Sequence, residues 1–343
     1  MKCILELIDI CPSETYHPAI EFLVNAIGCN LFPSDTHDVM STFNESLLLH
    51  TILRRFPNHK SQYKNVMKFI MKHKTSPNIP NFLLQEFISL GNMAVLGLQQ
   101  EFTEYHTTFP FFFISHLKTA TSNHNLIQNT AIFITNLCSI FPTNSWPFAL
   151  DFLEIISTYI QQPHTPDCID PIISCIESIS ALAPVLKNDL VSFLEDLMGL
   201  LQVVWDRAKN IWFTNAVPET RVKFIGTLLN AYTQILQGLR KTGKAVRMRY
   251  HLDSLFRFMN WCVANVKLPG ITVIVLLLIG NIGDAFPAGD LYRLYQMDFI
   301  EQTLQNALQI QPKVTFHTLL FARTAILKQL IPVTQLITLS ILT

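Results

Sequence analysis

No combination of residue types and spacing in this sequence predicts catalysis or metal binding. It contains no HExxH pair, no GxxxxGK[ST] loop, no GxSxG turn and no Cys and His at metal-ligand spacing. Glu14 and His17 form an isolated pair that we expect on the surface. Gly280 and Gly283 lie inside an apolar helical segment, so we expect them to permit close helix packing rather than to bind phosphate. We therefore expect no catalytic residue, no cofactor and no metal, and an enzyme is the least favoured hypothesis.

Basic residues are densest in one short stretch, which we expect to form the turn between two helices. Its members are Arg240, Lys241, Lys244, Arg247 and Arg249. One interpretation is a solvated turn whose cations complement the end of the preceding helix. The other is a contact with an acidic partner or a phosphate group.

The helices that would carry these charges recur along the chain. Residues 271–286 are largely apolar and end in two large side chains, Ile282 and Phe286, one helical turn apart. Similar tails begin at residues 98, 137, 179, 235 and 282, at intervals of 39, 42, 56 and 47. Periods of about 40–47 residues are typical of HEAT-type helix pairs. The sequence therefore predicts an all-α solenoid of HEAT/armadillo-type antiparallel pairs.

We expect residues 1–343 to form one array of helices. Residues 1–75 are expected to form less regular helices, at 1–11, 16–27, 40–56 and 63–71. Regular pairs should occupy 81–330, namely 81–98 with 102–117, 125–141 with 146–160, 170–182 with 188–204, 217–239 with 246–266 and 271–286 with 291–308, then 314–330. Pro110 should kink its helix, and an insertion is expected near 205–215.

The apolar ends of the chain bear on its place in such an array. Solenoids need polar terminal caps, whereas the first expected helix opens almost at once and residues 331–343 are an apolar tail. The sequence therefore predicts the C-terminal part of a longer array, or a shortened copy of one.

Composition limits the class of protein further. Apolar residues make up 49% and charged residues 15%, which excludes disorder. Twenty-five basic and 25 acidic residues cancel, so no overall charge attracts nucleic acid or acidic membranes. The apolar run at 271–279 is shorter than the roughly 20 residues of a membrane span. We expect no signal peptide, no membrane insertion and no direct nucleic-acid partner.

The seven cysteines include no CxxC pair, which favours a reducing compartment. Cys138, Cys175 and Cys262 lie in apolar helical patterns and are predicted to be small core residues.

Acidic residues on the expected second helices are candidate partner contacts. In this architecture the second helices line the concave face, where carboxylates can pair with the cations of a basic ligand. The candidates are Glu104, Asp151, Glu154, Glu195, Asp196 and Asp253. Ordinary solvated charges are an equally good interpretation. Trp205 and Trp212, in the expected insertion, are either anchors of that loop or a partner site.

Three segments resemble the C-terminal HEAT repeats of the importin-β family. Residues 94–138 have an EF-x-x-Y start, an aromatic helix containing Pro110 and a helix ending in a Leu-Cys pair. Residues 231–239, AYTQILQGL, and 278–286, LIGNIGDAF, resemble later segments in the family's order and spacing. The resemblance covers roughly residues 40–330. It implies a nuclear import receptor, of cytoplasm and nucleus at the pore, that binds a basic importin-α segment or cargo and also phenylalanine-glycine nucleoporins.

Two departures modify what the resemblance implies. The family's N-terminal half, with its main Ran contact, has no counterpart, so Ran-GTP binding should be weak or absent. The family is strongly acidic, whereas this chain is neutral.

Phe321 stands where the family has a tryptophan that helps to hold importin-α. An aromatic ring can stack on a cation, and core packing is the other interpretation of Phe321. The alternative function is a HEAT-repeat scaffold subunit of a non-transport complex.

Overall fold

The computed structural model describes residues 39–57, 60–75, 79–142, 147–165, 168–214, 217–266, 268–309 and 312–330. The predicted helices at 1–11 and 16–27, the pair Glu14 and His17, and the tail 331–343 lie outside the described residues. Every regular element in the described residues is a helix, and none of these residues is in a strand. The chain divides into two compact units between Tyr159 and Ile160. One array over residues 1–343 stays a prediction.

The first unit consists of helices of 10–18 residues with two short 3-10 helices among them. They are α3 (Val39–Arg55), α4 (Lys60–Lys72), η1 (His73–Thr75), α5 (Asn81–Leu98), η2 (Gln99–Glu104), α6 (Thr108–Leu117), α7 (His124–Ile140) and the beginning of α8 (Ala149–Gln161). Helix α5 packs against both α3 and α4 on one side and α7 on the other. The core of the unit is rich in phenylalanine, and the rings of Phe113 and Phe133 meet edge-to-face at 5.1 Å.

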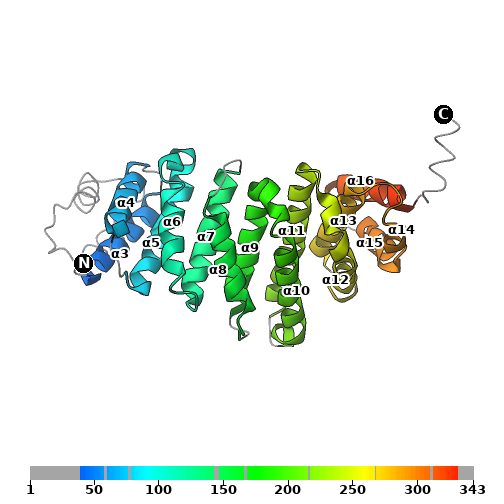
Figure 1. The fold of residues 1–343 in the computed structure, drawn as a ribbon, viewed down its shortest axis with the longest axis horizontal. Coiled ribbons are helices and arrows are strands. Elements are labelled where there is room, and N and C mark those ends of the chain that lie inside the picture. The colour runs from blue at the N-terminus through cyan, green and yellow to red at the C-terminus, as the bar shows by residue number, and fades with distance from the viewer. Residues whose placement is uncertain are drawn as a thin grey trace. The chain divides into compact units, whose positions relative to one another are not determined.

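The second unit repeats a pair of helices. Its elements are α9 (Ile169–Leu186), η4 (Lys187–Val191), α10 (Leu194–Asn210), η5 (Trp212–Thr214), α11 (Pro218–Lys241), η6 (Ala245–His251), α12 (Leu252–Asn265), α13 (Pro269–Ala285), α14 (Tyr292–Tyr295), α15 (Asp298–Leu308) and α16 (Pro312–Leu330). The first helices form one packed row, in which α9 contacts α11, α11 contacts α13 and α13 contacts α16 (Figure 1). This stacking of like helices at each repeat confirms the predicted all-α solenoid.

Helix α13 contains most of the apolar segment 271–286 that ends in the recurring pair of large side chains, and it is buried as expected. Ile279 and Ile282 are fully buried, and Asn281 is 4% exposed. Gly280 and Gly283 face α16: an added Cβ at Gly280 would lie 2.7 Å from the ring of Phe321, and one at Gly283 would lie 3.0 Å from Ala325. The expected packing role of the two glycines is confirmed.

Several expected helices are interrupted or displaced. The prediction of one helix over 102–117 kinked at Pro110 is wrong, because α6 begins only at Thr108. Pro110 therefore lies in a first helical turn, where the backbone N–H that proline lacks would have no partner within the helix. Likewise 246–266 divides into η6 and α12, and 291–308 divides into α14 and α15.

Much of the segment expected as an insertion near 205–215 belongs to helix α10, and its two tryptophans are buried. Helix α10 continues to Asn210, so only residues from Ile211 onward leave the helix. Trp205 is 6% exposed and its ring lies 4.5 Å from that of Phe258, while Trp212 is 1% exposed. Both tryptophans are therefore anchors in the core of the second unit rather than exposed partner contacts.

One helix passes the length and composition test for crossing a membrane, contrary to the prediction that no segment does. Helix α9 has 18 residues with a mean hydropathy of 1.5, but 78% of it is buried within the protein. It packs against α11, as an apolar helix in a protein core does.

Candidate functional site

The second unit brings three of the predicted carboxylates together. Glu195 and Asp196 lie in the first turn of α10, and Asp253 lies in the first turn of α12. Nε2 of His251, directly before α12, lies 3.2 Å from Oε2 of Glu195. The Ser254 hydroxyl also donates to the side-chain oxygen of Gln202, about two turns further along α10. The starts of these two second helices are therefore neighbours, and we call Glu195, Asp196 and Asp253 the acidic cluster.

The acidic cluster is open to solvent. The side chain of Glu195 is 74% exposed, and Asp196 and Asp253 are also exposed. The approach of His251 to Glu195 lacks hydrogen-bond geometry, and neither Asp196 nor Asp253 forms an ion pair with a described residue. First-turn carboxylates interact favourably with the positive end of the helix dipole, and their exposure leaves these three accessible to the cations of a ligand.

The other three predicted carboxylates, in the first unit, form no comparable group. Glu104 ends the 3-10 helix η2 rather than lying on a second helix. Asp151 pairs with Lys118 at 3.2 Å, and Glu154 is exposed one turn further along α8. No contact joins Glu104 to the other two among the described residues. Whether they contact a partner stays a prediction.

Phe321 is part of the seam between α13 and α16. Its ring is half-buried and covers the position where Gly280 lacks a side chain. This contact supports the packing interpretation, because the ring fills the space that Gly280 leaves open beside α13.

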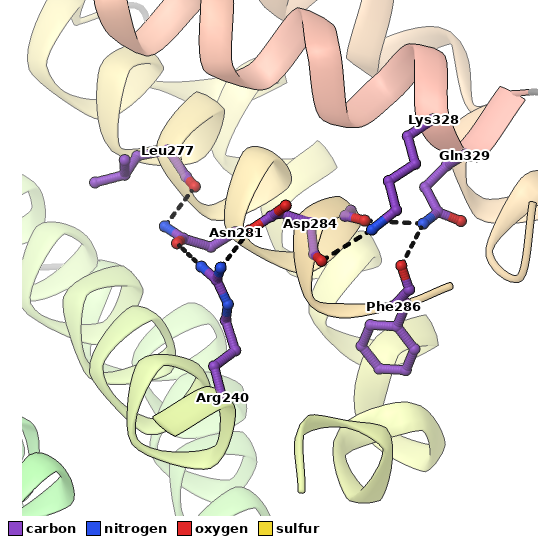
Figure 2. A network of polar contacts seen from close by, with 8 residues as sticks. Arg240, Leu277, Asn281, Asp284, Phe286, Lys328 and Gln329 are labelled. Atoms are coloured by element: carbon purple, nitrogen blue, oxygen red, sulfur yellow. Dashed lines mark hydrogen bonds and ion pairs between the residues drawn. The ribbon is translucent and has the colours of Figure 1, made fainter. Parts of the chain in front are cut away.

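A polar network fastens the end of α13 (Figure 2). The Arg240 guanidinium, from α11, donates to the side-chain oxygen of Asn281 at 3.2 Å and to the carboxylate of Asp284. Asn281 in turn donates to the carbonyl of Leu277 at 2.8 Å. Three first helices in succession are thereby connected, since Lys328 of α16 donates to the backbone carbonyl of Asp284 at 3.0 Å.

Gln329, next to Lys328 and fully buried, caps the same helix end. Its amide nitrogen donates to the carbonyls of Gly283 at 2.9 Å, Phe286 at 3.2 Å and Pro287 at 2.9 Å. Its oxygen accepts from the backbone N–H of Leu291 at 2.9 Å. The last carbonyls of a helix have no partner within the helix, and a side chain from the neighbouring repeat satisfies them here.

The basic stretch separates into held and free cations, which the sequence pattern alone did not show. Arg240 belongs to the network of α13, and Arg249 lies 3.5 Å from the carboxylate of Asp290. Lys241, Lys244 and Arg247 are exposed and form no ion pair with a described residue. Arg240 and Arg249 thus hold acidic residues of the following repeat, a role that neither interpretation of the stretch included, and both interpretations stay open for the other three cations.

Buried titratable groups in the described residues have structural roles. Burial raises the pKa of the Tyr295 hydroxyl, which donates to the carbonyl of Ile279. Burial also raises the pKa of the Cys138 thiol to about 12 and raises the pKa values of the Cys175 and Cys262 thiols. Such thiols are inert core residues, as predicted.

A stack of helix pairs, each packed on its neighbours, defines the class of α-solenoids, which have extended concave surfaces. Within that class, the family profile described as "Importin subunit beta-1-like, TPR repeats" matches residues 35–308. The chain therefore belongs to the importin-β family.

Individual relatives agree with this assignment. Importin subunit beta-1 of Schizosaccharomyces pombe (strain 972 / ATCC 24843) is 23% identical over 282 residues, which are 79% of this chain and 31% of that protein. This chain thus spans about a third of the length of the curated relative it matches.

Solved structures show the same fold. One, described as "Kap95p Binding Induces the Switch Loops of RanGDP to adopt the GTP-bound Conformation: Implications for Nuclear Import Complex Assembly Dynamics", has a TM-score of 0.76 at 16% identity, over 96% of this chain and 40% of that one. Another, the "Kap95:Nup1 complex", has a TM-score of 0.66 at 17% identity, over 96% and 39%.

Proposed function

We propose that this chain is a nuclear transport receptor of the importin-β type, which binds a Lys/Arg-rich segment of importin-α or of cargo during protein import. It acts by binding and performs no chemistry, in the cytoplasm and nucleus and at the pore. The observation that carries the proposal is the acidic cluster, where the contact between His251 and Glu195 brings the starts of α10 and α12 together. Membership of the family supports it.

The proposed binding is weak because the chain lacks net charge. Charges attract over only about 8 Å at physiological salt, so no long-range field draws a cationic ligand to this neutral chain. Each exposed ion pair contributes at most about 1 kcal/mol. A few such pairs together with apolar contacts amount to about −8 kcal/mol, which corresponds to a micromolar dissociation constant.

Fluorescence anisotropy with a labelled Lys/Arg-rich peptide of the importin-α type tests the proposal across a salt series. We expect micromolar binding that weakens as salt rises and that is lost in the variant with Glu195→Lys and Asp196→Lys. The matched control is Asp170→Lys with Glu219→Lys, which reverses two exposed first-turn carboxylates on the first helices α9 and α11. Binding that is tight and indifferent both to salt and to the Glu195 and Asp196 reversal would place the ligand elsewhere.

Two further partners follow from the family. Similar solved structures are of Kap95p with Ran and of Kap95 with Nup1. We propose that phenylalanine-glycine nucleoporins bind this chain, and that Ran-GTP binds these 343 residues weakly or not at all. Titration of the chain with Ran loaded with GTP and with GDP tests the proposal on Ran. Nanomolar affinity that depends on the nucleotide would overturn it.

A further inference from the structure

The segment between α11 and α12 is a 3-10 helix, and its geometry sorts its side chains onto three edges. Gly243, with φ of 69°, turns the chain out of α11, and η6 then runs over Ala245–His251. In a 3-10 helix, side chains three positions apart lie directly above one another. The backbone N–H of Arg247 donates to the carbonyl of Lys244 at 3.0 Å, which extends this spacing back to Lys244.

One of the three edges is packed against the protein and a second is held at one residue. Ala245 and Met248 are buried, and the half-buried His251 continues their edge. Arg249 is on the second edge and is held by Asp290, both through the carboxylate at 3.5 Å and through the carbonyl at 3.3 Å.

The third edge consists of Lys244, Arg247 and Tyr250, and we call it the free edge. Lys244 and Arg247 are exposed, and Tyr250 is 86% exposed. None of the three forms an ion pair or a ring contact with a described residue. Lys241 adds a third free cation from the last turn of α11.

The free edge is amphipathic, because two unpaired cations are followed along it by an exposed aromatic ring. A rise of about 2.0 Å per residue separates successive members of the free edge by about 6 Å. An extended peptide places alternate side chains on one face at about 6.6 Å. Two carboxylates at alternate positions, followed by an apolar side chain, therefore match Lys244, Arg247 and Tyr250 in both spacing and chemistry.

We propose that the free edge is a docking surface for an acidic peptide segment of another protein, bound in extended form. Its carboxylates pair with Arg247 and Lys244, and its apolar side chain packs on the ring of Tyr250. The observations favour a peptide over nucleic acid, because three local cations on a neutral chain provide few of the roughly 6–10 phosphate contacts typical of nucleic-acid binders.

The test uses the full chain and a fluorescein-labelled peptide in which glutamate alternates with serine and is followed by leucine. We expect salt-sensitive binding that weakens about tenfold or more in the variant with Lys244→Glu and Arg247→Glu. Tyr250→Ser should weaken binding several-fold while leaving its salt dependence unchanged. Both changes are on an exposed edge, so folding should be preserved.

The matched control is Lys209→Glu with Lys223→Glu, which changes the net charge by the same amount. Lys209 lies in the last turn of α10, and Lys223 is near the start of α11, about 27 Å along that helix from Lys241 at a rise of about 1.5 Å per residue. Affinity should be unchanged in this control. Equal losses in both double variants, or tighter binding of a short single-stranded oligothymidylate than of the peptide, would overturn the proposal.

Discussion

Arg240 and Asp284 are 44 positions apart, and the guanidinium of the first donates to the carboxylate of the second. Several other side-chain contacts join residues at about the same separation. Asn136 and Asn92 are 44 apart, and Gln100 reaches the carbonyl of Ile140 at a separation of 40. The period first seen in apolar side chains is thus also the period of the polar contacts between repeats.

The cap provided by Gln329 should be worth more than the exposed pair between Arg240 and Asp284. We expect Gln329→Leu to lower the free energy of unfolding by about 2–3 kcal/mol, because it leaves buried carbonyls without donors. Urea denaturation measures the loss, and faster hydrogen exchange near the end of α13 should accompany it. Gln302→Leu, the same change at an exposed position of α15, should alter stability by less than about 0.5 kcal/mol. Equal effects would show that the cap contributes nothing.

Two glycines should respond to alanine in opposite directions. An added Cβ at Gly283 would lie 2.8 Å from the Tyr295 hydroxyl and 3.0 Å from a backbone oxygen of α16. Overpacking of this kind costs about 1–3 kcal/mol, so Gly283→Ala should lower the thermal midpoint. Gly199 has nothing within 4 Å of an added Cβ, and Gly199→Ala should stabilise α10 by up to about 1 kcal/mol. A stabilised Gly283→Ala variant would contradict the close seam.

His73 should make the first unit sensitive to acid. Burial first, and then the charge of Lys72, lower the pKa of its imidazole from 6.5, and its ring packs beside those of Phe69 and Phe87, with centroids 5.4 Å from each. A histidine whose pKa is lowered by folding stabilises fully above its unfolded pKa and loses that contribution as the pH falls. The thermal midpoint of the protein should therefore decrease as the pH is lowered from 6.5. This decrease should be smaller in the variant with His73→Gln. His317→Gln, at an exposed site on α16, should retain the full acid loss.

The buried thiols should resist alkylation in the folded protein. Only the thiolate reacts, and burial raises the pKa of Cys138 to about 12 and that of Cys175 above its usual range. Iodoacetamide followed by peptide mass spectrometry should leave both unmodified at pH 8 and modify both in urea. Rapid modification of Cys175 in native buffer would mean that α9 opens readily.

The helices that apolar periodicity predicted well are those flanked by clear breaks. Helix α5 begins at Asn81, directly after Pro80, and ends at Leu98, as expected. The free edge could not be predicted, because Lys244, Arg247 and Tyr250 fit either helix type over so short a segment. A period of 3.0 cannot be told from 3.6 over seven residues, and the buried positions Ala245 and Met248 fit both.

The acidic cluster was predictable only in part. Glu195, Asp196 and Asp253 were expected on second helices from their place in the repeat, and the structure has them there. Their proximity depends on two tertiary contacts between α10 and the start of α12, from His251 to Glu195 and from Ser254 to Gln202. Apolar periodicity places residues within a repeat and says nothing about such contacts between repeats.

The seam between α13 and α16 has a mechanical consequence. Where Gly280 and Gly283 remove the side chains between two helices, the helices are already in contact and cannot be compressed further. The interface between α13 and α16 therefore resists compression. A force on the second unit is expected to act first on single side-chain hydrogen bonds between its helices. Arg207 provides one such contact, since its guanidinium donates to the carbonyls of Ile160, Gln161 and Gln162. Under tension these hydrogen bonds should release one by one before the glycine seam separates, so the unit should lengthen in small steps.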